Sequence, residues 1–408
     1  DFYSKVQTLS TNPTSAVARS EFVETAIALC AQLNQSSQQL SDLRTSLVGD
    51  PNIVGSVNSS KLAISCEELN TKLKMLADIN KTIAVSISSD STVKNSIFDQ
   101  RDMLLDEISS YIPVNIEENP NGTVNVSLGN IFLIKGTEQK LSFNVVANSS
   151  ANPDEVYKTP SLVQLVDKDG NTVVQNANNL INSGSIGAII DVGGADSTKL
   201  TIFSVLESLD TFAAAFAETV NAIQLYVDDP VNPTKAALCL DSSTNPATLK
   251  VATEPIFVNT SGGTTGIKAS NIKINQAIVD NPDEIATARG SITAGVPDNI
   301  NATDDKSNIL EMAQVRNKKL SGLNNLTTEE YLANFTGNLG VKITSIDNKK
   351  ETQESIVQQI SITLESQRGV NLDEELIDLV KFQRAYEASA RIFNVCNEIL
   401  ETLVKLGT

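Results

Sequence analysis

Histidine and tryptophan are absent from the chain, and aromatic residues make up only 4% of it. Histidine is the side chain that most often acts as a general acid or base and most often binds transition metals. Without it, most hydrolases and metalloenzymes would lack their usual reagents. We therefore expect a protein that is not an enzyme, with no catalytic residue, no cofactor and no metal site.

Long apolar runs are absent as well. No stretch approaches the roughly 20 consecutive apolar residues that a membrane-spanning helix needs. The first residues, Asp1 to Lys5, show no signal-peptide pattern and lack an initiating methionine. We expect a trimmed chain that has no contact with a membrane.

Net positive charge and clustered cysteines are missing too. The 31 Lys and Arg residues minus the 49 Asp and Glu residues give a net charge of −18. Such a charge would repel the phosphates of a nucleic acid. The cysteines lie far apart, without the CxxC spacing of zinc or redox sites, so we expect free and mostly buried thiols. They are Cys30, Cys66, Cys239 and Cys396.

Aliphatic residues, by contrast, are plentiful and recur at helical spacing. Within residues 22–47 and again within 62–87, apolar residues alternate steps of four and three, which is the period of supercoiling helices. We predict two long antiparallel helices there. A third helix is expected to begin at Asp99 and to end before Pro113.

Residues 113–175 change to the alternating pattern of strands. Asn121-Gly122 and Asp169-Gly170 each separate two such runs, and both dipeptides favour tight hairpin turns. We therefore predict antiparallel strands. The segment DKDGN at 167–171 resembles a calcium loop, but its glycine comes too early for an EF-hand, so a hairpin turn is the better interpretation.

The rest of the chain returns to helix around one exception. Residues 206–226 show a helical pattern, whereas residues 228–300 are rich in Pro, Gly, Thr and Asn, as an inserted β domain would be. Glycine-containing breaks separate the helical patterns that follow. These lie at residues 309–320, 331–335, 341–364 and 372–406.

Together the patterns predict an α+β protein. Its N- and C-terminal helices would form an elongated helical bundle, or rod, that carries antiparallel β hairpins and an inserted small β-rich domain. Residues 1–226 would form one portion of the rod, with a β-hairpin region at about 113–175 packed along it. Residues 227–304 would form the outer domain. Residues 305–408 would complete the rod, with 369–408 as the terminal assembly helix.

The last of these helices has an unusually wide apolar surface, which needs more than one neighbour. It could be buried within the chain's own bundle, or it could bury one side against other subunits. Periodicity alone leaves both alternatives open.

Motifs in this helix are similar to the C-terminal signature of flagellar hook-associated proteins. They are GVNLDEE at 369–375, FQRAY at 382–386 and ASAR at 388–391. Upstream, DQRD at 99–102 and LLDE at 104–107 extend the resemblance to the FlgK family, in the same order. Two features depart from the family pattern: the usual N-terminal segment, which pairs with the final helix, is missing, and cysteines are present.

The resemblance implies a structural component of the bacterial flagellum at the hook–filament junction. It implies an extracellular place, reached through the flagellar type III export apparatus without a cleaved signal peptide. The implied partners are the hook protein, the second hook-associated junction protein, an export chaperone and a ring of about eleven copies. The residues we nominate for assembly and chaperone binding are Leu372, Leu376, Leu379, Phe382, Tyr386, Phe393 and Leu400.

Two other functions stay open. A second junction protein or a flagellin-like filament subunit would also have helical ends and a variable middle. A surface adhesin or an enzyme displayed on a flagellar scaffold would instead have its working site in residues 227–304. A pocket of converging polar side chains there would favour that second function, and a convex solvated surface would not.

Overall fold

The structure is a computed structural model that describes residues 1–85, 91–196 and 199–368. It divides into two compact units, Asp1–Gly337 and Asn338–Thr408. Helices and antiparallel sheets make up the first unit, which confirms the predicted α+β class.

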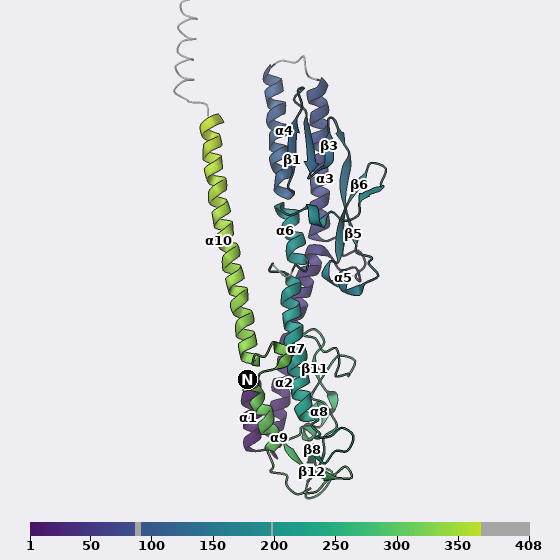
Figure 1. Cartoon of the computed structure of the whole chain (residues 1–408), viewed down its shortest axis with the longest axis vertical. Coiled ribbons are helices and arrows are strands. Elements are labelled where there is room, and N and C mark those ends of the chain that lie inside the picture. The colour runs from purple at the N-terminus through teal and green to yellow at the C-terminus, as the bar shows by residue number, and fades with distance from the viewer. Residues whose placement is uncertain (86–90, 197–198, 369–408) are drawn as a thin grey trace, which may run out of the picture. The chain divides into compact units, whose positions relative to one another are not determined.

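Long helices form the framework of the first unit (Figure 1). The longest that lies wholly in this unit, α2, begins where the Ser15 hydroxyl accepts a hydrogen bond from the Ala18 N–H. It ends at Gly49, whose φ of +81° suits glycine and where a Cβ would lie 2.5 Å from the Val57 Cα. The helices are α1 (Phe2–Thr11), α2 (Ala16–Val48), α3 (Lys61–Val85), α4 (Ser91–Tyr111), α6 (Gly184–Gly193), α7 (Ile202–Gln224) and α9 (Ser307–Gln314).

Helix α4 starts eight residues before the predicted start at Asp99, so that boundary was wrong. The physical reason lies in Phe98, whose ring is 4.8 Å from the Arg101 guanidinium and lies against Gly122 of the hairpin turn. The turn that precedes Asp99 therefore has packing of its own.

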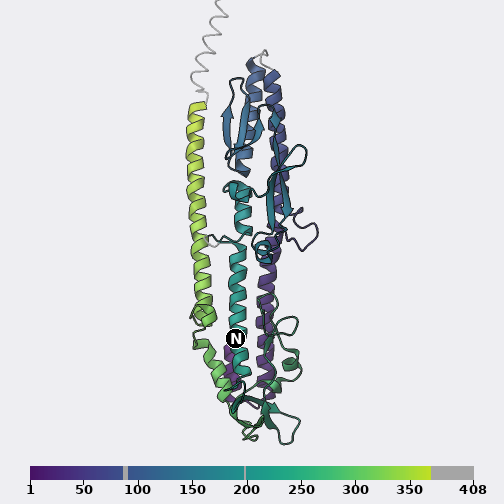
Figure 2. The ribbon, with the colours of Figure 1, turned by 45° about the vertical axis from the view of Figure 1, so that its right-hand side comes forward.

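The predicted antiparallel pairing of the first two long helices was also wrong. Figures 1 and 2 show α3 beyond the C-terminal end of α2, with α4 alongside α3. Buried residues of α2 up to Leu33 pack in one apolar cluster, and those of α3 pack in another that α2 reaches only at Val48. The heptad pattern of α3 is therefore covered by α4 and by strands.

Antiparallel strands occupy residues 115–174, as predicted. One sheet has the order β1-β2-β3-β4 and the other β5-β6-β7. Asn121-Gly122 joins β1 to β2 and Asp169-Gly170 joins β6 to β7, which confirms both predicted hairpins. The Asp167 Oδ1 accepts hydrogen bonds from the Asp169 and Asn171 N–H groups, so DKDGN forms a turn.

The elements of this region are short and follow one another closely. They are β1 (Asn115–Glu118), β2 (Val124–Leu128), β3 (Ile131–Lys135), β4 (Glu138–Gln139), β5 (Leu141–Ala147), α5 (Pro153–Lys158), β6 (Ser161–Asp167), β7 (Thr172–Val174) and the 3-10 turn η2 (Asn178–Leu180).

Residues 227–304 contain two different kinds of structure. A sheet of order β13-β12-β8-β9 has small apolar clusters of its own. The stretch 256–285 instead contributes Ile256, Phe257 and Ile278 to the cluster of α1, α2 and α7. The elements are β8 (Lys235–Asp241), β9 (Thr248–Val251), β10 (Phe257–Val258), β11 (Lys273–Ile274), α8 (Gln276–Asp280), η3 (Pro282–Glu284), β12 (Ala288–Thr293) and β13 (Val296–Pro297).

The helix expected at residues 309–320 ends early. After α9 come the 3-10 turns η4 (Val315–Asn317) and η5 (Ser321–Leu323), and Leu320 forms a β-bridge with Leu326. The bridge needs the chain to reverse, and Asn324 and Asn325 do so with φ values of 56° and 59°.

The last described helix, α10 (Thr328–Arg368), is continuous, so the glycine-containing break predicted between residues 335 and 341 was wrong. Gly337 and Gly340 both have φ values outside the left-handed region, and a Cβ at either would meet nothing within 4 Å. Neither glycine serves a turn there, and the cost of glycine in a helix is too small to end it.

Two apolar clusters form the core of the first unit. The first cluster contains buried residues of α1, α2, α7, α9 and the stretch 256–285, with Phe2, Phe22, Phe216 and Phe257 at its centre. The second cluster lies between α3, α4, α6 and the two sheets of residues 115–174.

Side-chain amides on the helices hold the strands and loops by their main chain. The Asn80 Nδ2 donates to the Val124 and Gly136 carbonyls at 2.8 and 2.7 Å, and its Oδ1 accepts from the Val124 N–H. Asn70 forms the same pair of bonds with Phe143. We refer to the residues that make such bonds as amide clamps. They are Asn34, Asn70, Asn80, Asn221 and Gln224.

Candidate assembly surface

The seven residues nominated for assembly, from Leu372 to Leu400, lie outside the described part of the chain. Among the described residues, the part of α10 that follows Asn338 carries several exposed large apolar side chains. This part of α10 is the candidate assembly surface.

The first turns of α10, which belong to the first unit, are firmly capped and anchored. The Glu330 N–H donates to the Thr327 hydroxyl, and the Thr327 N–H donates to the Glu330 carboxylate, which is a complete capping box. The Tyr331 hydroxyl donates to the Ser208 carbonyl at 3.1 Å, and its ring stacks on Phe212. The start of the helix is thus fixed by this unit's core.

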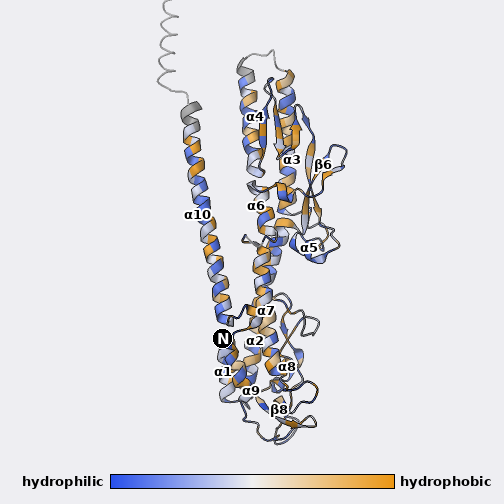
Figure 3. Cartoon of the chain, in the orientation of Figure 1, coloured by the Kyte–Doolittle hydropathy of each residue, from blue (hydrophilic) through white to orange (hydrophobic). Residues whose placement is uncertain are grey.

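From residue 339 onward, α10 carries an apolar stripe, and the exposed Val341, Ile356 and Ile362 lie outside it. Steps of four and three lead through Leu339, Ile343 and Ile346, and resume at Val357 and Ile360. The side chains of Ile343, Ile346, Val357 and Ile360 are 46%, 52%, 65% and 54% exposed. Figure 3 shows apolar positions recurring between polar ones along this helix. We call these five residues the α10 seam.

Polar residues Lys350 and Gln353 occupy the seam positions between Ile346 and Val357. A spacing of about 3.5 residues is the pattern of helices that pack side by side, and polar residues within such a seam fix register at some cost in stability. Residues 341–364 were predicted only as a helix, and the seam was missed although the same periodicity predicts α2 and α3.

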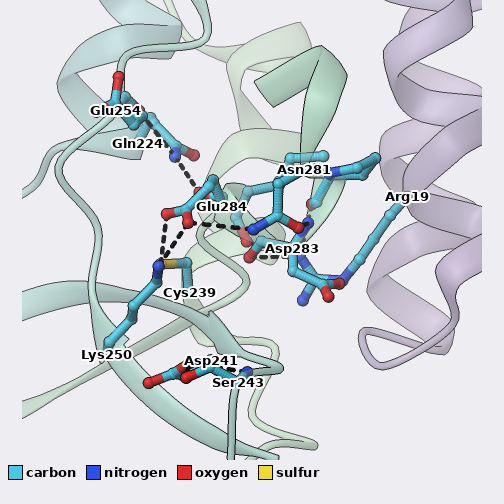
Figure 4. A network of polar contacts seen from close by, with 12 residues as sticks. Arg19, Gln224, Cys239, Asp241, Ser243, Lys250, Glu254, Asn281, Asp283 and Glu284 are labelled. Carbon is cyan, nitrogen blue, oxygen red and sulfur yellow. Dashed lines mark hydrogen bonds and ion pairs between the residues drawn. The ribbon is translucent and has the colours of Figure 1, made fainter. Parts of the chain in front are cut away.

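A second feature of interest is the buried Arg19, which joins α2 to the turn η3 (Figure 4). Its guanidinium is fully buried and donates to the carbonyls of Pro13, Pro282 and Ile285. Burial lowers the pKa of Arg19, and the nearby Asp283 carboxylate opposes that change. The arrangement is structural, because main-chain acceptors surround the charge.

Next to it, Cys239, Lys250 and Glu284 come together within residues 227–304 (Figure 4). The Cys239 side chain is fully buried, and burial followed by the Glu284 charge raises the pKa of its thiol to about 12. A thiol that stays protonated is a poor nucleophile. The Glu284 carboxylate instead accepts from Lys250, whose pKa this hydrogen bond raises. This group therefore gives no support to an enzyme site in that segment.

The described cysteines match the expectation of buried free thiols. Cys30, Cys66 and Cys239 are all buried and unpaired with one another, and burial raises the pKa of Cys30 and Cys66 to about 12. Within residues 1–85, 91–196 and 199–368, no three potential ligands among His, Cys, Asp and Glu lie together as a metal site. No helix in the same part of the chain is long and apolar enough to cross a membrane.

Arg101, from the DQRD motif, fastens α4 to the first hairpin. Its guanidinium donates to the Gly122 carbonyl at 2.7 Å and to the carboxylates of Asp102 and Glu118. Gly122 lies in the tight turn between β1 and β2. This motif residue is therefore accounted for by internal packing.

Comparisons with protein families match both ends of the chain. The model described as "Flagellar hook-associated protein FlgK helical domain" matches residues 1–225. The model described as "Flagellar basal body rod FlgEFG protein C-terminal" matches residues 366–406.

Comparisons with individual proteins agree with the family models. Flagellar hook-associated protein 1 of Bacillus subtilis is 25% identical, over 99% of this chain and 74% of its own length. The Escherichia coli protein of the same description is 24% identical, over 100% and 80%. The solved structure of the flagellar hook junction protein FlgK from Burkholderia pseudomallei superposes with a TM-score of 0.63 at 16% identity, covering 91% of this chain and 93% of that one. At that identity the superposition supports the fold alone.

Proposed function

Because the chain belongs to the family of flagellar hook-associated protein FlgK, whose helical-domain model matches residues 1–225, we propose that it joins hook to filament. It does so as a structural subunit of the flagellum, whose activity is binding. The family is one of structural proteins, and the expectation that the chain is not an enzyme agrees with it.

The observation that carries the proposal is the α10 seam. Burying the exposed half of one such side chain contributes about 1 kcal/mol, so four of them contribute about 4 kcal/mol per contact. Exposing such a stripe to water is unfavourable, and assembly removes the exposure by burying the stripe.

We assign the seam of a second copy as the occupant. Residues 338–368 carry four basic side chains (Lys342, Lys349, Lys350, Arg368) and four acidic ones (Asp347, Glu351, Glu354, Glu365), so their net charge is zero. The whole chain carries −18. Two copies can therefore bring these segments together without net charge repulsion between the segments themselves.

The remaining parts of the proposal concern partners and place. The resemblance to hook-associated proteins implies a ring of about eleven copies of the subunit between the hook protein and the second junction protein. It reaches its extracellular place through the flagellar type III export apparatus, with a chaperone bound to Leu372, Leu376, Leu379, Phe382, Tyr386, Phe393 and Leu400.

We also propose that residues 227–304 form an outer domain. The independent apolar clusters of the sheet β13-β12-β8-β9 support this division. The stretch 256–285, which packs with α1, α2 and α7, would form its base.

The test is to delete the gene in a motile host and to restore it with variants. Deletion is expected to give hooks without filaments, with flagellin released into the medium. The variant Ile346→Asp with Val357→Asp places two charges in the α10 seam and should fail to restore filaments. The control Asn348→Asp with Ser355→Asp adds the same charges to the opposite side of the helix and should restore them.

Normal filaments after deletion would refute the junction function. Restoration by both double variants would refute the role of the seam while leaving the junction function intact. Chaperone binding has its own test, because Leu379→Asp with Tyr386→Asp should abolish it without unfolding the outer domain. Unchanged affinity of the chaperone for that variant would reject the nominated residues.

A further inference from the structure

The two apolar clusters of the first unit do not meet along α2. Leu33 is the last residue of this helix in the first cluster, and Val48 is the first in the second. Between them the buried residues of α2 are the polar Ser37 and Arg44. Figures 1 and 2 show α2 and α7 running side by side through this narrow part of the unit. We call residues 34–47 of α2 and 202–211 of α7 the waist.

Arg44 fills the centre of the waist. Its Nε donates to the Gly193 carbonyl at 2.8 Å, and its Nη2 donates to the Tyr157 and Lys158 carbonyls at 2.6 and 3.1 Å. The guanidinium carbon also lies 5.4 Å from the centre of the Tyr157 ring and 5.5 Å from that of Phe203. Both distances are those of cation–π contacts.

The groups that Arg44 holds come from both sides of the waist. Gly193 is the last residue of α6. Tyr157 lies in α5, which connects β5 to β6, and both strands contribute to the second cluster. Phe203 belongs to α7, which continues into the first cluster, and its ring meets Tyr157 edge-on at 5.2 Å. The guanidinium of Arg44 therefore connects parts that no continuous apolar core connects.

The helix itself is weakest at this level. Ser36 and Ser37 follow each other in α2, and serine pairs are among the recognised positions of helix bending. Serine also competes for main-chain hydrogen bonds and lowers helix propensity. Apolar packing at this level is thinner than in either cluster, with Ile202, Phe203 and Leu206 of α7 as its buried apolar residues, and the directional bonds of Arg44 lie beside them.

We propose that the waist is a hinge at which the two halves of the first unit tilt, and that Arg44 is the latch that holds them aligned. Tilting breaks the three carbonyl bonds and separates the guanidinium from the aromatic pair. It leaves both apolar clusters intact. This inference goes beyond the proposed junction function and concerns the isolated chain.

The test measures the distance between two spin labels by pulsed electron spin resonance on the full chain. Glu218→Cys on α7 and Lys74→Cys on α3 are exposed positions on the two sides, introduced after the native cysteines are replaced by alanine. Arg44→Met keeps an unbranched, flexible side chain similar to the aliphatic part of arginine and removes the donors. Arg101→Met is the matched control, because Arg101 donates to Gly122 within the second cluster's side of the unit.

Arg44→Met should broaden the distance distribution at least about twofold, and Arg101→Met should leave its width unchanged. Amide exchange in residues 34–47 should rise about 10- to 100-fold in the same variant, as expected when several charged hydrogen bonds are lost. An unchanged width in Arg44→Met would overturn the hinge, even with faster exchange. If that variant does not fold, Phe203→Leu is measured in its place, and the same width decides.

Discussion

Replacing Asn221 by leucine tests whether the amide clamps hold the strands. The Asn221 Nδ2 donates to the Phe257 carbonyl at 2.7 Å, and its Oδ1 accepts from the Ile256 and Phe257 N–H groups at 3.0 and 2.9 Å. All three main-chain groups belong to Ile256 and Phe257, which have no exposed surface. Leucine has nearly the same shape and leaves all three groups without a partner.

The expected loss follows from this count. A net hydrogen bond contributes about 1 kcal/mol, and a buried group left unpaired costs about 1–3 kcal/mol, so the free energy of unfolding should fall by about 3–5 kcal/mol. That is a large part of the total stability of a domain, about 5–15 kcal/mol. The loss is measured by urea denaturation followed by far-ultraviolet circular dichroism, because the chain contains no tryptophan.

Asn334→Leu provides the control, since Asn334 is exposed on α10 and its replacement should change stability by less than about 0.5 kcal/mol. Equal stability of the two variants would refute the clamp. It would mean that the main chain at residues 256–257 is held by apolar packing of Ile256 and Phe257 alone.

Three further outcomes are expected. At pH 8 a thiol reagent should leave Cys30, Cys66 and Cys239 unmodified in the folded chain, because they are buried and their pKa values are about 12; mass spectrometry locates any label. Gly193→Ala should destabilise the protein by about 1–3 kcal/mol in thermal unfolding, because the new Cβ would lie 2.4 Å from the Val48 Cγ1, whereas Gly337→Ala, in open space, should stabilise it by about 0.5–1 kcal/mol. Hydrogen bonds from the Thr234 side chain and from main-chain N–H groups lower the pKa of Asp228, so its stabilisation is present above about pH 4, the unfolded value, and is lost as the pH falls further; Asp228→Asn should show a smaller loss in acid titrations of stability.

Local patterns predicted the elements well. The heptad spacing identified α2 and α3 to within a few residues at their inner ends, and Asn121-Gly122 and Asp169-Gly170 marked the two hairpin turns. These features depend on neighbours in the sequence, so the sequence contains what is needed to find them.

The neighbours of each element were harder to predict. The apolar pattern of α3 predicts that one face of the helix is buried. It does not indicate which elements cover that face, and these are α4 and strands, not α2. Asn80 lies at a position of the apolar pattern of α3, yet its partners, Val124 and Gly136, lie 44 and 56 positions away. A buried amide at an apolar position is the signal that could have identified a clamp, but its partner is a main-chain group, which leaves no mark in the sequence.

The candidate site was predicted less completely than the elements. The nominated residues lie beyond Arg368 and remain a prediction, while the α10 seam, present in the sequence at the same period as α2, was missed. The glycines at 337 and 340 also suggested an interruption where the helix continues. Glycine weakens a helix by about 1 kcal/mol, which capping and length readily offset.

The amide clamps have one more consequence, for protein engineering. Main-chain carbonyl and N–H groups are chemically alike in different residues. The bonds of Asn221 therefore depend on the backbone conformation at residues 256–257 and not on which side chains these residues carry. A foreign peptide inserted in the exposed turn at 260–265 should therefore leave the Asn221 bonds in place, whereas Ile267, Ala269 and Ile272 must stay because they belong to the first cluster. Exposed turns whose ends are held in this way are suitable places to graft an epitope or an affinity tag.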